Sequence, residues 1–302
     1  MPHNLPIRSL LRGAVLALLV LLAPAAAAAG PVKVVATFTI LADMVRQVGG
    51  DAVAVTALVG PDGDAHVYSP TPADARAVAE ADLLVVNGLG MEGWLDRLGA
   101  AAGYKGPVVV ASDGVDVLHI AEDGRTVPDP HAWQDLAQGR IYVANIAAGL
   151  ARIDPAHAAD YRAGAERYSR TLAELDRWVR AELAVVPPDK RRVITSHDAF
   201  GYFGRAYGIT FLAPEGIDTD AEVTARDLAR LVVQVRNTGV KALFLENMSD
   251  PRLVEQLAAE TGATIGGTLY VDALSAPDGP APTYVAMFRS NVPKLAAAML
   301  KN

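Results

Sequence analysis

The sequence predicts an α/β protein built as two doubly wound parallel-sheet lobes joined by one long rigid helix. Three observations lead to this prediction. The segment 154–186 has the apolar spacing of a single long helix, and a stretch of comparable length lies on each side of it. Each of these two stretches alternates short β-branched runs with helical patterns, which is typical of parallel sheets with right-handed crossovers.

The long helix is expected to act as a strut. Asp154 can serve as its N-cap, and Pro155 suits the first turn, where a missing N–H costs nothing. At 1.5 Å per residue the helix would be roughly 48 Å long, more than an ordinary crossover needs. Its apolar stripe recurs every three or four residues, at Tyr161, Ala165, Tyr168, Leu172, Leu175, Val179 and Leu183.

The first lobe is predicted to alternate four strands with helices. A Gly- and Pro-rich loop, 60–66, follows its second strand, and a polar loop, 112–130, follows its fourth. The predicted strands are 32–38, 52–59, 83–87 and 108–111, and the predicted helices are 40–48, one from 71, 91–99 and 135–153.

The second lobe repeats this scheme after the strut. Its predicted strands are 192–196, 209–213, 242–245 and 263–269, with helices at 199–207, 225–239, 251–261 and 285–300.

The start of the chain has the pattern of a secretory signal peptide. Arg8 and Arg12 precede an apolar run at 14–22, and Ala27-Ala28-Ala29 offers a cleavage site before Gly30. A membrane anchor is the alternative, but the apolar run is short and Pro24 interrupts it. We therefore divide the chain into a signal peptide (1–29), an N-terminal lobe (30–153), a linking helix (154–186) and a C-terminal lobe (187–302).

The amino-acid composition limits the cellular location of the protein and the kinds of partner it can bind. The sequence has no cysteine, which excludes disulfides, thiolate chemistry and a lipidated cysteine, so we expect a periplasmic protein that is not a lipoprotein. Without Arg8 and Arg12 the chain has 25 basic residues against 34 acidic ones, a net charge of about −9. No nucleic-acid partner is expected, since phosphate binding needs a basic face. The protein is expected to be a monomer.

Four polar side chains follow strands at the edge where parallel sheets bind ligands. His66 and His131 follow the second and fourth strands of the first lobe, and His197 and Asp272 follow the first and fourth strands of the second. A single loop histidine is most often a solvated residue, but three of the five histidines after position 29 occupy equivalent places. Three imidazoles and a carboxylate would fill a tetrahedral zinc site and close it to water.

Three other motifs suggest different chemistry. Ser196-His197-Asp198 lists the members of a catalytic triad, but adjacent residues cannot adopt its geometry. The segment 88–93 matches a dinucleotide-binding fingerprint, although Glu92 would bring a carboxylate next to the pyrophosphate. Glu246 ends a strand on the same edge and could either orient a ligand or lie on the surface.

Five segments of the chain together match one known family: 60–70 with Asp-Ala-His, 87–94, 129–133, 195–200 and 271–275. On these segments the chain resembles the metal-specific solute-binding proteins of ABC transporters that capture zinc or manganese in the periplasm (cluster A-I), and within them the zinc-specific branch. The likeness covers nearly the whole chain after residue 29, and it implies two α/β lobes bridged by a long helix. One departure is that the loop 113–130 is short, whereas many zinc members carry a long histidine-rich loop there.

The resemblance implies that His66, His131, His197 and Asp272 are the metal ligands and that the protein is not an enzyme. Zn²⁺ is the expected transported ion and Mn²⁺ the less favoured one, because manganese-selective relatives commonly have a carboxylate in place of His197. The expected partner is an ABC-transporter membrane permease, and a periplasmic zinc-donating protein is a further candidate. The alternatives are a manganese-binding protein of the same type, an exported zinc hydrolase with Glu246 as base, and an exported nucleotide-dependent oxidoreductase using 88–93.

Overall fold

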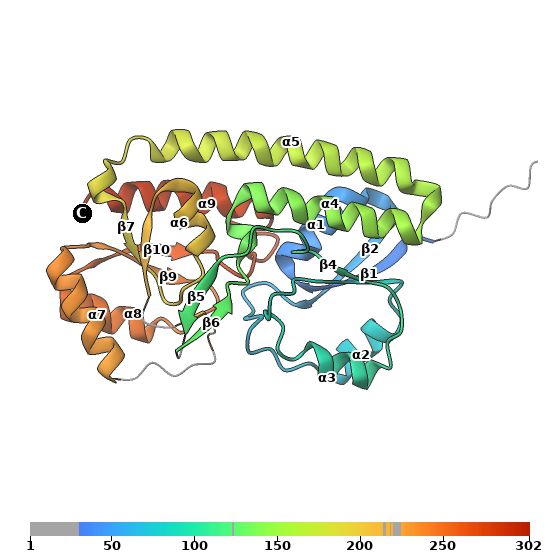
Figure 1. The fold of residues 1–302 in the computed structure, drawn as a ribbon, viewed down its shortest axis with the longest axis horizontal. Helices are drawn as coiled ribbons and strands as arrows, with labels where there is room; N and C mark the ends of the chain where they lie inside the picture. The colour runs from blue at the N-terminus through green and yellow to red at the C-terminus, as the bar shows by residue number, and fades with distance from the viewer. Residues whose placement is uncertain (1–29, 123, 214–215, 218, 220–224) are drawn as a thin grey trace, which may run out of the picture. The chain divides into compact units, whose positions relative to one another are not determined.

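The computed structural model describes residues 30–122, 124–213, 216, 217, 219 and 225–302. Pro31–Asn302 is one compact unit, and it contains the two parallel-sheet lobes that the sequence predicts (Figure 1). The predicted signal peptide, 1–29, lies outside the described residues. Among the described residues, no helix combines the length and the apolar character needed to cross a membrane.

The first lobe is built on a four-stranded sheet of order β2-β1-β3-β4, in which every neighbouring pair is parallel. Helices α1 and α4 contact one face of this sheet, and Figure 1 shows α2 and α3 on the opposite side. The elements are β1 (Val32–Phe38), α1 (Thr39–Gly49), η1 (Gly50–Ala52), β2 (Val53–Val59), α2 (Pro72–Ala79), β3 (Leu83–Val86), α3 (Leu95–Ala102), β4 (Val108–Val110), η2 (Ala132–Gln134) and α4 (Leu136–Ile153).

The second lobe has a parallel sheet of order β10-β9-β7-β8. Helices α6 and α9 contact one side of it, while α8 and α7 pack on the other around a separate apolar cluster that includes Leu231, Leu243 and Leu257. The elements are η4 (Pro188–Lys190), β7 (Arg192–Ile194), α6 (Gly201–Tyr207), β8 (Thr210–Leu212), α7 (Ala225–Thr238), β9 (Ala242–Glu246), α8 (Arg252–Thr261), β10 (Thr264–Leu269) and α9 (Tyr284–Met299).

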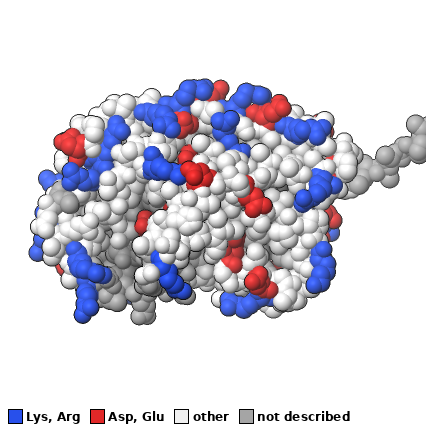
Figure 2. Space-filling model, in the orientation of Figure 1, with Lys and Arg blue, Asp and Glu red and all other residues white. Residues whose placement is uncertain are grey.

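The long helix α5 (Ala158–Leu183) runs over both lobes and contacts α1 and α4 in the first and α9 in the second (Figure 1). Its buried face is the predicted stripe, except that Gly164 rather than Ala165 meets α1. Its outer face carries charges of both signs, which Figure 2 shows mixed along the top of the molecule. A helix with one apolar stripe and one charged face is held by packing rather than by its own propensity.

The prediction of one unbroken helix over 154–186 is wrong at both ends. A short 3₁₀ turn, η3 (Pro155–His157), precedes α5, and α5 ends at Leu183, so its length is 26 residues or about 39 Å. Asp154 does not cap the helix. Its Oδ2 instead accepts hydrogen bonds from Tyr161 Oη at 2.6 Å and His157 Nδ1 at 2.7 Å, because the 3₁₀ turn brings these groups within reach.

Two further local predictions are also wrong. The polar loop 112–130 contains an antiparallel hairpin, β5 (His119–Glu122) and β6 (Arg125–Pro128). The predicted helix 91–99 begins only at Leu95, because Gly88, Leu89 and Gly90 all have positive φ angles and the chain must first leave this turn.

Direct hydrogen bonds join the two lobes next to the carboxyl ends of their strands. Asp62 N donates to Leu274 O at 3.0 Å, and Leu274 N donates to Thr39 Oγ1 at 2.8 Å. Trp133 Nε1 donates to Val271 O at 3.2 Å. The polar loops of one lobe are therefore positioned by the backbone of the other.

Candidate metal centre

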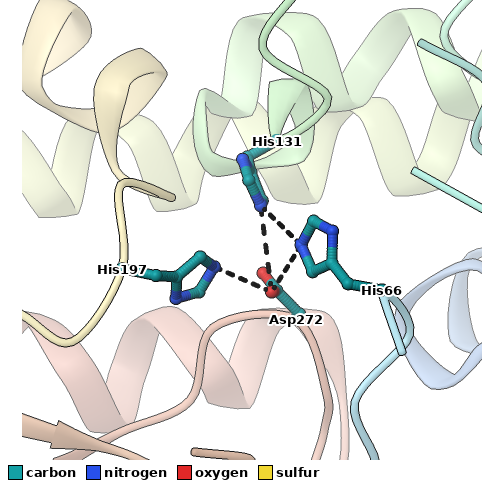
Figure 3. Close-up of side chains that lie close together, drawn as sticks. All are labelled: His66, His131, His197 and Asp272. Carbon is teal, nitrogen blue, oxygen red and sulfur yellow. Dashed lines mark hydrogen bonds and ion pairs between the residues drawn. The ribbon is translucent and has the colours of Figure 1, made fainter. Parts of the chain in front are cut away.

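The four predicted site residues come together between the lobes. His66 lies in the loop after β2, and His131 lies after the hairpin at the start of η2; His197 follows β7 and Asp272 follows β10. Figure 3 shows their side chains pointing toward one another from four separate backbone segments. Each offers one ligand atom, and these four atoms all lie within 4.8 Å of one another.

The distances within the cluster fit a single small cation. His66 Nε2 lies 3.2 Å from His131 Nε2, and Asp272 Oδ2 lies 3.1 Å from His197 Nε2 (Figure 3). Asp272 Oδ2 is also 3.5 Å from His66 Nε2 and 3.8 Å from His131 Nε2. A tetrahedral zinc site with bonds of about 2.05 Å has ligand atoms about 3.3 Å apart. These four of the six distances between the ligand atoms are thus close to the spacing in a tetrahedral zinc site.

The cluster is buried, and some of its polar atoms lack hydrogen-bond partners among the described residues. The side chains of His131, His197 and Asp272 are fully buried, and that of His66 is 3% exposed. Among the described residues, His197 Nε2 and both carboxylate oxygens of Asp272 form no hydrogen bond of acceptable geometry. His197 Nε2 and Asp272 Oδ2 nevertheless lie only 3.1 Å apart. Buried polar atoms are normally paired, so unpaired ones that face one point fit a metal ion.

Glu246 orients His197. The last residue of β9, it is buried, and its Oε2 lies 2.5 Å from His197 Nδ1. Its other oxygen accepts hydrogen bonds from Ser196 N at 2.8 Å and His197 N at 3.2 Å. A proton on Nδ1 leaves Nε2 with its lone pair directed at the cluster. Of the two roles that the sequence left open for Glu246, the structure favours orientation of a clustered side chain, since Glu246 is buried against His197.

Asp129 orients His131 in the same way. Its Oδ1 accepts from His131 N at 2.9 Å and lies 2.8 Å from His131 Nδ1, which again leaves Nε2 for a metal. Tyr202 of the second lobe donates to Asp129 O at 3.1 Å. A Cβ atom at Gly201 would lie 2.7 Å from Asp129 Oδ2, so the close approach of α6 requires a glycine there.

The other two residues of the cluster are fixed through their backbones. Asp64 Oδ1 accepts from His66 N at 2.8 Å, and Asp64 Oδ2 accepts from Thr219 Oγ1 of the second lobe at 2.7 Å. The side chain of Asn247 forms hydrogen bonds with the backbone of both neighbours of Asp272. Its Oδ1 accepts from Val271 N at 3.3 Å, and its Nδ2 donates to Ala273 O at 3.2 Å. Sequence reasoning did not identify Asp64 or Asn247.

The charges in the cluster shift its proton affinities. Burial lowers the pKa of the His197 imidazole, but the negative charges of Glu246 and Asp272 outweigh burial and raise this pKa well above its ordinary value. Burial raises the pKa of Asp272, but the neighbouring His131 and His197 outweigh it, so this pKa lies far below its usual range. Asp272 is therefore an anion at any physiological pH.

A hollow of about 300 Å³ leads from the surface to the edge of the cluster. Of the four clustered residues, His66 is the one that lines it; the other lining residues are almost all apolar. They are Leu89, Gly90, Val127, Pro128, Pro130 and Ile217.

The competing motifs do not form the sites that their sequences suggest. In the segment 88–93, Glu92 itself occupies the backbone N–H groups of Asn87 and Gly88, at 2.6 and 3.1 Å, which a pyrophosphate would need. Asp198 N donates to Gly216 O, and His197 bonds Glu246 rather than Ser196. His119 lies on β5 and belongs to no metal-ligand cluster of the described residues.

The comparisons with known proteins identify the family. The family described as "Zinc-uptake complex component A periplasmic" (ZnuA) matches residues 34–298. The chain belongs to the ZnuA family.

Relatives of this ZnuA-family chain are named for different metals. The iron-binding protein YfeA of Yersinia pestis is 32% identical over 87% of this chain and 85% of its own length. The manganese ABC transporter substrate-binding lipoprotein PsaA of Streptococcus anginosus is 30% identical over 89% of each chain. The periplasmic zinc-binding protein TroA of Treponema pallidum shares the fold with a TM-score of 0.84 at 29% identity, over 89% of this chain and 99% of that one.

The chain is thus a metal-binding substrate-binding protein of an ABC transporter and not an enzyme. Proteins of this kind act outside the cytoplasm together with a membrane permease and an ATPase. The expectation that the protein is not an enzyme is confirmed, and the two alternatives, an exported zinc hydrolase and a nucleotide-dependent oxidoreductase, do not hold, since the family consists of transport proteins. Because the named relatives bind iron, manganese or zinc, the family alone leaves the choice of metal open.

Proposed function

We propose that this protein captures Zn²⁺ in the periplasm with His66, His131, His197 and Asp272 and delivers it to the permease of an ABC transporter. The observation that carries the proposal is the convergence of three imidazole nitrogens and one carboxylate oxygen at zinc-like spacing, in a buried cluster. Glu246 and Asp129 would keep two of the imidazoles in the metal-binding tautomer.

Zinc is favoured over manganese by the chemistry of the donor atoms. Imidazole nitrogen suits Zn²⁺, while Mn²⁺ prefers carboxylate, carbonyl and water oxygens in a larger coordination shell. Three nitrogens and a single carboxylate in a closed pocket therefore support zinc. A manganese-binding function is the second candidate, and the relatives named for manganese support it.

The assignment of ligands and metal can be tested together. Protein purified from the periplasm without added salts should carry zinc by elemental analysis, and Zn²⁺ should displace Mn²⁺ in competition. His197→Ala should weaken Zn²⁺ binding by at least a hundredfold, because it removes a ligand rather than an outer partner of one. Unchanged zinc affinity in His197→Ala would refute the ligand set, and preferential loading with manganese would support the second candidate.

We also propose residues 1–29 as a cleaved signal peptide, with lobes at 30–153 and 187–302 joined by 154–186. The absence of cysteine from the sequence supports a protein without a lipid anchor, although several relatives are named lipoproteins. The protein is proposed to act as a monomer, with a periplasmic zinc-donating protein as a further partner. Mass spectrometry of the periplasmic protein tests the export claim: the expected N-terminus is Gly30 without a lipid adduct.

A further inference from the structure

The segment Asn87–Trp94 follows β3, a strand that carries none of the four clustered residues. It contains the fingerprint-like glycines, and the metal-binding function leaves it without a role. Its turn is unusual, since Gly88, Leu89 and Gly90 have φ angles of 83°, 55° and 87°. Leucine at positive φ is strained, and such strain persists only where the surroundings enforce it.

At one end of the segment, Asn87 holds the residue before His131. The side chain of Asn87 is fully buried, and its Nδ2 donates to Pro130 O at 3.0 Å. Tyr142 Oη donates to Asn87 Oδ1 at 2.7 Å, which fixes the orientation of the amide. The peptide group that leads into His131 is therefore tied to β3.

At the other end, Trp94 holds the residue before His66. Trp94 Nε1 donates to Ala65 O at 2.7 Å, and the indole is buried. The ring also packs against Tyr68, with centroids 5.3 Å apart. The loop that carries His66 is thus bonded to the same eight-residue segment on the carbonyl immediately before the imidazole.

Glu92 fixes the segment itself. One carboxylate oxygen accepts from Asn87 N at 2.6 Å and from Thr37 Oγ1 of β1 at 2.7 Å, and the other accepts from Gly88 N at 3.1 Å. These bonds hold the strained turn against the sheet. Asn87 and Trp94 therefore project from one rigid base.

We propose that Asn87 and Trp94 are positioning residues that set the spacing of the two first-lobe metal ligands, His131 and His66, through the carbonyl before each. The proposal rests on the proposed function, in which these histidines bind zinc. It assigns to 87–94 in the first lobe the task that Glu246 and Asn247 perform beside His197 and Asp272 in the second. In each lobe, residues at the end of a strand that carries no metal-binding residue (β3 in the first lobe, β9 in the second) would thus support two metal-binding residues.

A double-mutant cycle tests the Trp94 branch. Trp94→Phe removes the Nε1–H donor while keeping an aromatic ring against Tyr68. Zn²⁺ affinity is read by competition with a chromophoric chelator, which does not depend on tryptophan fluorescence. Trp94→Phe should weaken Zn²⁺ binding on the order of tenfold, and Co²⁺ bound in place of zinc should show an altered visible spectrum. In a His66→Ala background Trp94→Phe should cause no further loss, whereas in a His197→Ala background the tenfold loss should remain.

The Asn87 branch is tested in the same way. Asn87→Ala should lose its effect on Zn²⁺ affinity in His131→Ala and retain it in His197→Ala. Asn145→Ala is the matched control, because Asn145 Nδ2 donates to the carbonyls of Ala111 and Asp113, both at 2.8 Å, away from the ligands. It should lower stability and leave Zn²⁺ affinity unchanged.

The outcomes distinguish a failure of the positioning role from a failure of the proposed zinc-binding function. If Trp94→Phe lowered Zn²⁺ affinity equally in the His66→Ala and His197→Ala backgrounds, Trp94 would have only a general structural role and the inference would be overturned. Unchanged affinity in Trp94→Phe and Asn87→Ala would also overturn it. If the single variants His66→Ala and His131→Ala themselves bound Zn²⁺ normally, the proposed function would fail first.

Discussion

At the scale of single residues, the proton competes with the metal. Burial lowers the pKa of His197, but the negative charges of Glu246 and Asp272 outweigh it and raise this pKa, so a proton on Nε2 competes with a bound metal up to a higher pH than on a free histidine. Zinc must displace this proton, because only neutral imidazole binds metal. Affinity for Zn²⁺ should therefore fall about tenfold per pH unit as pH decreases, for each proton displaced, and this slope should extend above pH 7. Chelator competition at pH 6.5, 7.0, 7.5 and 8.0 measures it. A constant affinity over this range would contradict a charged His197.

Glu246→Gln is expected to change both the affinity and this pH dependence. A single amide oxygen cannot accept from His197 Nδ1 and from the two backbone N–H groups that Glu246 now bonds. Loss of such an outer partner typically costs 10- to 100-fold in metal affinity. Removal of the negative charge should also lower the pKa of His197, so the slope of affinity against pH should be shallower than in the wild type.

Asp176→Asn is a suitable control for this charge removal. Asp176 lies on α5, which carries none of the four clustered residues, and its carboxylate accepts hydrogen bonds from Arg180 and Tyr207. It should leave both zinc affinity and its pH slope unchanged. A wild-type slope in Glu246→Gln would mean that another group takes up the displaced proton.

The four clustered residues were predictable because each follows a strand of a parallel sheet, and the carboxyl ends of such strands share one edge. Their supporting residues were only partly predictable. Asp129 and Asp64 stand two positions before a histidine, which is the spacing of an Asx turn and a usable signal. Asn247, Asn87 and Trp94 act on backbone carbonyls or amides far away in sequence. No local pattern marks such contacts, since tertiary packing alone creates them.

At the scale of elements, the helix α5 depends on close contact with α1. A Cβ atom on Gly164 would lie 2.2 Å from Val48 O, so a side chain there would force the two helices apart. Gly164→Ala should lower the free energy of unfolding by about 1–3 kcal/mol, although alanine is the better helix former. Denaturant unfolding of the metal-free protein measures the change.

Gly99→Ala provides the matched control for this substitution. Gly99 lies inside α3, and an added Cβ would meet nothing within 4 Å. Only the helix propensity changes there, so Gly99→Ala should raise stability by up to about 1 kcal/mol. Equal effects of the two alanines would show that the contact between α1 and α5 is not tight.

The elements themselves followed closely from periodicity and β-branched runs, and the exceptions have local causes. The hairpin β5–β6 lies in a short polar segment in which none of the side chains that the structure describes is fully buried, so hydrophobic alternation could not reveal it. The Asp-Gly dipeptide at positions 123–124 of the sequence was the available signal. The helix α5 starts later than predicted because the Asp154 side chain bonds Tyr161 and His157 instead of the first backbone N–H groups.

At the scale of the whole unit, the two lobes are tied together apart from the metal site. On α1, Asp43 Oδ2 accepts from Tyr284 N of α9 at 2.9 Å and from Tyr168 Oη of α5 at 3.3 Å. This one carboxylate joins both lobes and the strut. The lobes are therefore not free to hinge widely, and metal binding must act through small shifts of the loops around the cluster.

Removal of zinc should accordingly change stability far more than dimensions. Binding to the folded state alone stabilises it by about 4 kcal/mol at a free zinc concentration a thousandfold above the dissociation constant. For a unit of this size, that corresponds to a rise in melting temperature on the order of 10 °C. Small-angle scattering of the metal-free and zinc-bound forms should give nearly superimposable profiles, because the bonds between lobes persist without the ion. A clear decrease in radius of gyration on adding zinc would instead show that the lobes close on the metal, and the role assigned to α5 as a strut would be wrong.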